Sequence, residues 1–467
     1  MVALGCPKNV VDGEVMLGDL ARAGFDVVGE HESADAIVIN SCAFVEEAKD
    51  ESIQAILEAA RLRTEGSDGA GPKKIVVTGC MAQRYGEELA EGLPEADLVV
   101  GFENYQGLPG ALRETLDLDP AEGGGSVERV QVGSSTVPFR EEWGRHRLTP
   151  QHTAYLRVAE GCDHACTFCA IPGFRGKFRS KPYEQVVDEA RRLAAEGVRE
   201  LNIIAEDTNQ YGMDLKGGYR LAELLKELAA IEGIEWLRLL YCYPSYFTDE
   251  LIEAIATIPQ VCKYVDIPLQ HADNLVLLSM NRPTQQHTEK LLGKLRERIP
   301  GLVLRTTFIA GFPGESDQAH ANVVEFATRM GFQRMGAFAY SEEEGTPAAE
   351  MPSQLEREVR EARRDELSAL AQRMCEDFAA SRVGEEVDVL IDSVGVAPDM
   401  GFDEGDGDGA SEVVAVGRTM CEAPDIDPVV FVTLPEGVGL PPLEAGQLRR
   451  CRISNTITTD LEAEVLR

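Results

Sequence analysis

The feature that most constrains the fold is a series of six short apolar runs in residues 148–380, separated by helical segments. In YEQVVDEARRLAAEG, for example, Val186, Val187, Ala190 and Leu193 form one stripe at helical spacing. Six consecutive strand–helix units favour a parallel sheet with right-handed crossovers, either doubly wound or a partial barrel. The runs are YLRVAEG, ELNIIAED, WLRLLYCYP, YVDIPLQ, LVLRTTFIAGFP and MGAFAYS.

A smaller α/β pattern occupies residues 1–112. Two β-branched runs, AIVINSC and KIVVTGC, each end on a cysteine, and a helical stretch with Ile53 and Ile56 on one face separates them. The pattern predicts a small domain with a parallel sheet, whose ligands gather beyond the carboxyl ends of the strands. Residues 113–147 contain GGGS and GSS, lack clear periodicity and are interpreted as a linker.

The pattern changes again in residues 382–467. Four short strand-like runs, EEVDVLI, SEVVAVG, DPVVFVTL and QLRRCRIS, predict a small β-barrel. The insertion DMGFDEGDGDGA between the first two is acidic and Gly-rich, and is expected to be mobile. The whole chain is therefore expected to be an α/β protein of several domains.

Composition limits the classes of function. The net charge of −35 argues against binding a nucleic acid backbone by bulk electrostatics, although an acidic surface can also reflect solubility or a salty habitat. No apolar run is long enough to cross a membrane, and the start lacks a secretory signal, so a cytoplasmic protein without membrane contact is expected. Eleven cysteines in such a chain indicate metal or redox chemistry more than a disulfide framework.

The strongest chemical signal is the triplet GCDHACTFC, in which Cys162, Cys166 and Cys169 directly follow the first run of the core. Thiolates hold iron–sulfur clusters, and three ligands leave one iron of a [4Fe-4S] cubane open for a small molecule. A zinc site is the alternative, but no fourth Cys or His follows at the spacing of a zinc finger. His164 lies between the cysteines and is expected to point away from the cluster.

A second triplet, Cys6, Cys42 and Cys80, has no short-range spacing. Each cysteine, however, ends a predicted strand of one parallel sheet, so all three can meet at one edge and hold a second cluster. The alternative is that they are buried structural thiols. The other five cysteines show no such placement and are assigned to packing; they are Cys242, Cys262, Cys375, Cys421 and Cys451.

Polar residues at the ends of the core strands are candidates for cofactor binding, with loop capping as the alternative. Phe168 in the triplet and Arg305 within the fifth run complete a set that also contains Glu206, Asp207, Gln270, Gly311 and Glu315. The run FRGKFRSK places Lys177 and Arg179 directly after the triplet, where cations could hold a carboxylate of cofactor or substrate. Surface ion pairing explains this run equally well.

With an aromatic before its last cysteine, the triplet resembles that of the radical S-adenosylmethionine superfamily. The resemblance implies a partial (βα)6 barrel that cleaves S-adenosylmethionine to methionine and a 5′-deoxyadenosyl radical, which takes hydrogen from an unactivated carbon. A non-catalytic electron carrier with two clusters would not need such a barrel. An RNA-binding module is disfavoured by the charge.

Nearly the whole chain resembles the methylthiotransferase family, which has an N-terminal parallel α/β domain, a radical core and a TRAM-like β-barrel. LGCPKNVVDGEVMLG, GCMAQRYGEELAEGLPEAD, CKYVDIPLQHAD and SEEEGTPAAEMP are similar to the branch called RimO. That resemblance implies two [4Fe-4S] clusters, transfer of a methylthio group to the β-carbon of an aspartate in small-subunit ribosomal protein twelve, and an electron donor of flavodoxin or ferredoxin type.

The alternative branch, MiaB, modifies isopentenylated adenosine in tRNA. Residues 381–467 contain 18 Asp and Glu against 6 Arg and no Lys. An RNA-binding barrel should be basic, whereas an acidic one suits a basic ribosomal protein, so tRNA is not the expected partner.

Overall fold

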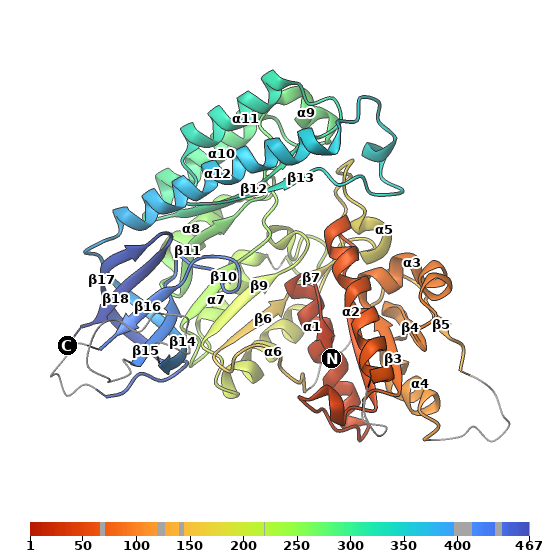
Figure 1. The fold of residues 1–467 in the computed structure, drawn as a ribbon. Helices are drawn as coiled ribbons and strands as arrows, with labels where there is room; N and C mark the ends of the chain where they lie inside the picture. Colours follow the sequence, from red (N-terminus) through yellow and green to blue (C-terminus); the bar gives the residue numbers. More distant parts are fainter. Residues whose placement is uncertain are drawn as a thin grey trace.

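The computed structural model describes residues 1–65, 71–118, 127–139, 144–218, 220–396, 413–434 and 441–466. Three units follow one another along the chain, and Figure 1 shows the central core between an N-terminal α/β unit and a C-terminal barrel. The acidic insertion at 399–410 lies outside the described residues. Within the described residues, no helix is long and apolar enough to cross a membrane.

The N-terminal unit is a five-stranded parallel sheet in the order β1-β2-β3-β4-β5. Its strands are β1 (Val2–Ala3), β2 (Ala36–Ser41), β3 (Lys74–Thr78), β4 (Leu98–Val100) and β5 (Val130–Gln131). Its helices are α1 (Pro7–Arg22), α2 (Glu46–Glu65), α3 (Gly79–Gly92) and α4 (Leu108–Thr115), with 3-10 turns at His31–Ser33 and Phe102–Gly107. Strand β5 falls in the segment that the sequence predicted to be a linker, because two residues carry no periodic pattern.

The core is a six-stranded parallel sheet in the order β13-β12-β11-β10-β9-β6. The order follows the chain without a reversal, so of the two architectures left open by the sequence the partial barrel is confirmed and the doubly wound sheet is not. The strands are β6 (Thr153–Arg157), β9 (Glu200–Ile204), β10 (Trp236–Leu239), β11 (Val261–Asp266), β12 (Val303–Ala310) and β13 (Arg334–Ala339). A short antiparallel pair, β7 (Ala159–Glu160) and β8 (Arg179–Ser180), flanks them.

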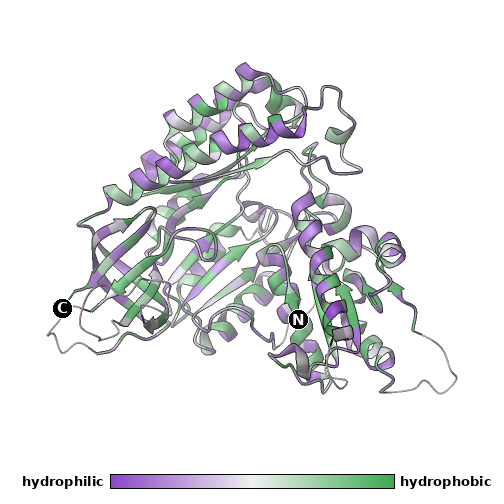
Figure 2. Cartoon of the chain, viewed as in Figure 1, coloured by the Kyte–Doolittle hydropathy of each residue, from purple (hydrophilic) through white to green (hydrophobic). Residues whose placement is uncertain are grey.

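Amphipathic helices cover the outer face of this sheet. They are α6 (Tyr183–Ala195), α7 (Leu221–Ala229), α8 (Asp249–Thr257), α9 (Asn274–Ser279), α10 (Gln285–Arg298), α11 (Asp317–Met330) and α12 (Arg357–Ser381), with 3-10 turns at Thr208–Gln210 and Pro347–Glu350. The short α5 (Ile171–Arg175) packs instead against the N-terminal unit, where Phe174 joins its apolar core. Side chains of Thr248, Asp273, Thr284 and Ser316 accept hydrogen bonds from the first turns of α8 to α11 and so fix where these helices begin. Figure 2 shows hydrophobic strands inside and hydrophilic residues on the outer helices.

The C-terminal unit is a closed barrel in the order β14-β15-β16-β18-β17. Its strands are β14 (Glu386–Val396), β15 (Val413–Arg418), β16 (Val430–Thr433), β17 (Leu448–Ile457) and β18 (Asp460–Val465). The sequence predicted four of them. Strand β18 was missed because its buried Leu461, Ala463 and Val465 alternate with acidic residues, which made the run read as polar.

Buried ion pairs join the barrel to the core. Arg418, at the end of β15, lies 2.8 Å from Glu200 of β9, and the Nε of Arg238 donates to the same carboxylate at 3.0 Å. One apolar cluster also holds Val11 of α1 and Ala423 of the barrel, together with residues of the core strands. The three units therefore share a continuous interior.

Candidate functional site

The first cysteine triplet lies on the loop that follows β7. The Cys162 amide donates to the carbonyl of Gly176 at 3.1 Å, and the Cys169 amide donates to the carbonyl of Cys166 at 3.1 Å. Gly161 has a φ of +76°, and a Cβ there would lie 2.3 Å from the Lys177 carbonyl oxygen. Only glycine fits this close approach, which brings the loop against the chain that leads into β8.

Three stacked side chains line this loop. His164 Nε2 lies 2.6 Å from Asp207 Oδ2, and the His164 ring stacks on Tyr243 with centroids 3.5 Å apart. Arg282 covers the Tyr243 ring at 4.2 Å, and its Nη1 lies 3.7 Å from Cys166 Sγ. The stack therefore ties both sides of the loop to the carboxyl ends of β9 and β10.

The second triplet forms at the carboxyl ends of three neighbouring parallel strands, as its sequence placement predicted. Cys6 precedes α1 after β1, Cys42 follows β2, and Cys80 lies in the first turn of α3 after β3. The three thiols are near enough for the charges of Cys6 and Cys42 to raise the pKa of Cys80. All of them are free of disulfide bonds.

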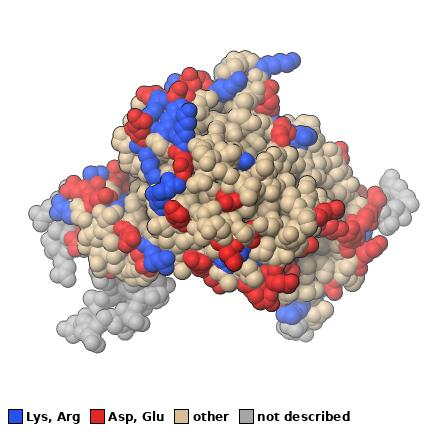
Figure 3. All heavy atoms as spheres, turned by 90° about the horizontal axis from the view of Figure 1, so that it is seen from above, with Lys and Arg blue, Asp and Glu red and all other residues tan. Residues whose placement is uncertain are grey.

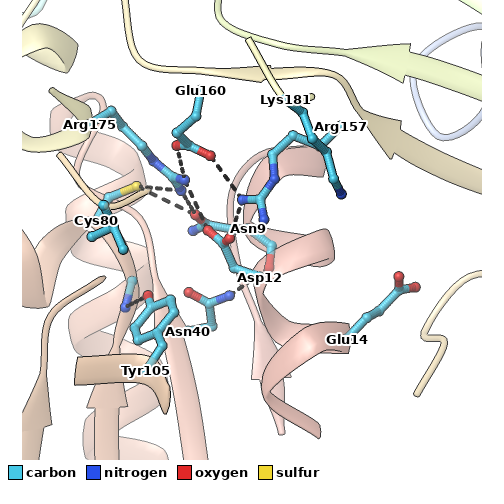
Figure 4. Close-up of polar contacts among 12 residues, drawn as sticks. Asn9, Asp12, Glu14, Asn40, Cys80, Tyr105, Arg157, Glu160, Arg175 and Lys181 are labelled. Atoms are coloured by element: carbon cyan, nitrogen blue, oxygen red, sulfur yellow. Dashed lines mark hydrogen bonds and ion pairs between the residues drawn. The ribbon is translucent and has the colours of Figure 1, made fainter. Parts of the chain in front are cut away.

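Arg175 links the second triplet to the segment that follows the first, and Figure 4 shows it beside Cys80, Asp12 and Glu160. It ends α5, six residues after Cys169, and its guanidinium donates to Asp12 at 2.9 Å and Glu160 at 2.8 Å. Its Nη2 donates to Asn9 at 2.6 Å and to Cys80 Sγ at 3.2 Å. This buried network fixes the N-terminal unit against the loop of the first triplet.

Burial shapes the titration of both triplets. It raises the pKa of Cys162 to about 12, and the nearby Asp207 and Glu206 add to this increase. It also raises the pKa of Cys169 and of Cys80 to about 12, the latter opposed by Arg175. Cys162, Cys169 and Cys80 are therefore neutral near pH 7 without a metal, and metal binding would release their protons.

Comparisons with known proteins cover the three units in turn. Residues 1–101 match Uncharacterized protein family UPF0004, residues 156–327 match the Radical SAM superfamily, and residues 383–466 match the TRAM domain. The ribosomal protein uS12 methylthiotransferase RimO of Desulforamulus reducens is 41% identical over 466 residues, which covers 100% of this chain and 98% of that protein. Its namesake from Desulfitobacterium hafniense is 44% identical over 467 residues, with the same coverage.

The chain belongs to the RimO family of radical SAM methylthiotransferases. A solved radical S-adenosylmethionine methyltransferase, TsrM from Kitasatospora setae with cobalamin and a [4Fe-4S] cluster bound, shares the fold at a TM-score of 0.51 and 17% identity. That likeness covers 72% of this chain and 70% of TsrM, and it supports the fold alone.

As a radical SAM enzyme of the RimO family, the chain uses S-adenosylmethionine and a [4Fe-4S] cluster, and the first triplet fits both. Both carboxylate oxygens of Glu206 and the Oδ1 of Asp207 are buried without a hydrogen-bond partner among the described residues, so they are available to a ligand. Within the residues that the structure describes, no three His, Cys, Asp or Glu side chains are placed to bind a single metal ion. Thiolates of a cubane bind separate irons, so this observation concerns mononuclear sites only.

Glu206 is the most perturbed carboxylate of this region. Burial, and then the charge of Glu160, raise its pKa to about 7, while Lys8 and Arg175 act in the opposite direction. It follows β9 at the carboxyl end of the sheet, where the sequence placed it. Contact of Glu206 and Asp207 with the cofactor stays a prediction, and their unpartnered carboxylate oxygens are compatible with it.

The other predicted cofactor residues have different surroundings in this RimO family member. Glu315 accepts hydrogen bonds from the Gly311 amide at 2.8 Å and from Arg363 at 2.9 Å, and Arg305 donates to Asp266 at 2.9 Å. These contacts within the chain hold Glu315 and Arg305 in place, and their contact with the cofactor stays a prediction. Phe168 packs against the cluster of Val276, Phe312 and Tyr340, which anchors the triplet loop.

Gln270 and Gly311 both adopt positive φ, +74° and +76°. Gln270 is half-buried. Its backbone amide donates to the Thr307 carbonyl at 2.8 Å, and its backbone carbonyl accepts from the Ile309 amide at 2.7 Å. The backbone is therefore fixed against β12, and the side chain stays a candidate for cofactor contact. At Gly311 a Cβ would lie 2.8 Å from the Cα of Arg360, so this glycine serves close packing with α12.

The basic run separates into buried and exposed cations. Arg175 and Lys181 are buried, and the Lys181 ammonium lies 2.5 Å from Glu189. Arg179 donates through Nε to the Val137 carbonyl at 2.7 Å, while the Lys177 side chain is 80% exposed. The two residues predicted to hold substrate thus differ, since Arg179 binds the backbone of this chain and Lys177 faces solvent.

The sequence analysis missed several polar residues of the site. Lys8, Asn9, Asp12 and Glu14 are all buried on α1, although a surface helix normally turns such residues outward. The sequence did contain an indication of this buried polar cluster, since four polar residues lie within nine positions after Cys6. The residues that these side chains contact are far away in the sequence, and no local pattern identifies such distant partners.

Proposed function

We propose that this chain attaches a methylthio group to the β-carbon of an aspartate in ribosomal protein uS12. The observation that supports the proposal is the Arg175 bridge, a buried network that joins Cys80 of the second triplet to the chain that follows the first triplet. In the radical SAM superfamily, a bound cluster and S-adenosylmethionine supply the radical that removes hydrogen from carbon. We further propose that Cys6, Cys42 and Cys80 hold a second [4Fe-4S] cluster, at which the sulfur is methylated.

The chain's own residues position the reactants and exclude water. Val11 and Val15 of α1 pack against Tyr155 and Trp236 of the core, which seals the N-terminal unit against the sheet. Arg175 and Arg157 hold Asp12 and Glu160 in the same interior. A dry, fixed geometry of this kind is what a reaction between two separate sites requires, because small misplacements lower rates strongly.

A basic protein substrate suits the charge of the molecule. In Figure 3, Lys and Arg gather in one band on the left of the face shown, and Asp and Glu are spread around the rest. The acidic excess of the barrel is partly internal, however, since Glu422 binds Arg334 at 3.0 Å and Asp392 binds Arg418 at 2.8 Å. Attraction of a ribosomal protein therefore involves the acidic surface of the whole chain as well as the barrel.

The remaining partners follow from the same proposal. Reductive cleavage of S-adenosylmethionine needs an electron, and we propose a flavodoxin or ferredoxin as its donor. We place the enzyme in the cytoplasm, where ribosomal proteins are made. The acidic charge disfavours tRNA, which would be the substrate of an enzyme of the MiaB type.

The test is a comparison of the two substrates. Reconstituted enzyme, S-adenosylmethionine and dithionite are incubated anaerobically with purified uS12 or with isopentenylated tRNA, and the products are analysed by mass spectrometry. We expect a mass gain of one methylthio group on an aspartate of uS12 and none on the tRNA. Modification of the tRNA alone would overturn the substrate assignment.

A further inference from the structure

We propose that the ammonium group of Lys8 binds the side-chain carboxylate of the substrate aspartate and selects for it. This inference rests on the proposed function, and it deepens that function by naming the group that recognises the reacting residue. Lys8 is the second residue of α1 and is separated from Cys6 by Pro7 alone. Proline at the first helical position sets the backbone direction, so Lys8 follows the triplet in a fixed orientation.

Lys8 lies between the second cysteine triplet and the carboxyl end of the core sheet. Its Nζ is 3.4 Å from the carbonyl oxygen of Ala205, the residue that directly follows β9. The next residue, Glu206, is near enough to act electrostatically on both Lys8 and Cys162. The side chain therefore crosses from the N-terminal triplet to the carboxyl end of the core sheet.

The buried ammonium has unused hydrogen-bonding capacity. Lys8 is 7% exposed, and its contacts are one long hydrogen bond to Ala205 and the face of the Tyr241 ring at 3.9 Å. Among the described residues, no carboxylate lies within ion-pair distance of Nζ, and the oxygens of Glu206 have no hydrogen-bond partner. An ammonium carries three donors, and a buried charge without a counter-ion is costly, so an anionic ligand is expected here.

The chemistry of the substrate places its carboxylate at this point. In aspartate the carboxylate is bonded directly to the β-carbon, so the group that binds it must lie beside the C–H bond that breaks. Three other cations near the triplets already contact groups of the described chain, although the Nε of Arg282 has no hydrogen-bond partner there. Arg175 binds Asp12 and Glu160, Arg282 covers Tyr243 and donates to the Pro268 carbonyl, and Arg305 binds Asp266.

Lys8 could instead balance the charge of the thiolates, since among its charged neighbours Cys6 contributes most to raising the pKa of Lys8. The cation that contacts a thiol of the second triplet within the described chain is Arg175, whose Nη2 donates to Cys80. Lys8 points past the triplet to the core sheet, since its hydrogen bond goes to Ala205. The direction of the side chain thus favours a ligand on the side of the second triplet that faces the carboxyl end of the core sheet.

The experiment compares two forms of the substrate with each enzyme variant. The aspartate that wild-type enzyme modifies is located by peptide mass spectrometry and changed to asparagine in purified uS12. Dissociation constants for the aspartate and asparagine forms are then measured anaerobically with reconstituted wild-type, Lys8→Met, Lys8→Gln and Lys8→Arg enzymes. For each enzyme preparation we compare the ratio of the dissociation constants of the asparagine and aspartate forms. Both constants come from the same preparation, so the ratio does not depend on the fraction of active enzyme.

We expect wild-type enzyme to bind the aspartate form about tenfold or more tightly than the asparagine form, as for a hydrogen-bonded ion pair. Lys8→Met and Lys8→Gln should bring the ratio close to one, and Lys8→Arg should keep part of it. Lys73→Met is the matched control, because Lys73 belongs to the same unit but pairs with Asp35 at the surface. The ratio of dissociation constants measured with Lys73→Met should equal that of wild-type enzyme.

Two results would overturn the assignment of Lys8 alone. One is a wild-type ratio that persists in Lys8→Met and Lys8→Gln. The other is loss of iron and sulfide in both neutral variants, which would make Lys8 a residue of cluster assembly. Failure of wild-type enzyme to modify uS12 at all would instead overturn the proposed function, and the inference would fall with it.

Discussion

The Nη2 of Arg175 lies 3.2 Å from the Sγ of Cys80, although the two residues belong to different units of the chain. Arg175 follows the first cysteine triplet by a few residues, and Cys80 is the last member of the second. The same guanidinium binds Asp12 of α1 and Glu160 of β7. A single buried side chain therefore sets the position of one triplet relative to the other.

Replacing this side chain should weaken the whole assembly. In Arg175→Met, Asp12 keeps Arg157 as a partner but shares it with Glu160, so the two buried carboxylates have one cation between them. We expect the free energy of unfolding to fall by about 3–5 kcal/mol, the usual result of removing one partner of a buried ion pair. Urea unfolding of the reconstituted enzyme, followed by circular dichroism, measures it.

Lys177→Met is the matched control for that experiment. Lys177 lies in the same basic run, but its side chain is exposed and its nearest carboxylate, Asp163, is 3.9 Å away. Its loss should change the stability by less than about 0.5 kcal/mol. Equal stabilities of the Arg175 and Lys177 variants would contradict the bridging role of Arg175.

Glu206 should make stability depend on pH. Its pKa rises from the ordinary 4.5 to about 7 in the folded protein, mainly because of burial. Between these values the unfolded chain binds fewer protons at this group than the folded chain, so the contribution of Glu206 to stability falls as pH rises. Glu206→Gln should therefore gain stability relative to wild type from pH 5 to pH 8.

Urea titrations of both proteins at pH 5.5, 6.5 and 7.5 measure that difference. Groups other than Glu206 are common to the two proteins and cancel in the comparison. A constant difference across the three pH values would show that Glu206 does not titrate in this window.

The sequence predicted the features that depend on local pattern. The six core strands, the helix stripes and the placement of Cys6, Cys42 and Cys80 at strand ends all follow from period and from the rule that parallel strands share a carboxyl edge. Elements without a strong period were missed. Strand β5 has two residues, and β18 contains three acidic ones.

Contacts between distant segments could not be predicted in this way. Asn9 and Asp12 meet Arg175 across more than 160 residues of sequence, and Glu200 meets Arg418 across the whole core. Each of these residues alone is typical of a solvated polar or charged side chain, which is the usual role of its type. Only the fold brings them together, and the contact of Glu315 with Arg363 was missed for the same reason.

Arg179 and Lys177 should differ in their effect on turnover. Arg179 donates to the backbone carbonyls of Val137, Arg175 and Lys177, which fixes the chain that follows the first triplet. Arg179→Ala should lower the rate of uS12 methylthiolation by about tenfold, because a looser loop misplaces the reacting groups. Lys177→Ala should stay within about twofold of wild type, since its side chain is exposed and its ion pair with Asp163, at 3.9 Å, is long.

Initial rates with iron content measured on the same samples test this difference. Full iron in both variants assigns the effect to positioning and not to loss of a cluster. Equal rates in the two variants would remove Arg179 from the site.

The docking of the barrel should also be measurable by single substitutions. Arg418→Met leaves the buried Glu200 with Arg238 as its only described ion-pair partner, and we expect a loss of about 3 kcal/mol or more. Arg450→Met removes an exposed ion pair with Asp388 and should cost about 0–1 kcal/mol. Thermal unfolding of both variants checks the contrast, and similar melting temperatures would argue against a barrel anchored in the core.

The account depends most on the two triplets acting as separate clusters in one reaction. The direct measurement compares wild-type enzyme with two triple variants, one with Ala at Cys162, Cys166 and Cys169 and one with Ala at Cys6, Cys42 and Cys80. Each of the three enzymes is reconstituted and assayed for iron. It is then incubated with S-adenosylmethionine, dithionite and uS12, and the amounts of 5′-deoxyadenosine and methylthiolated uS12 are measured.

We predict about half of the wild-type iron in each variant, as expected for the loss of one of two clusters of equal size. The core variant should form no 5′-deoxyadenosine, and the N-terminal variant should form it without methylthiolating uS12. An N-terminal variant that retained full iron and methylthiolated uS12 at the wild-type rate would contradict the account.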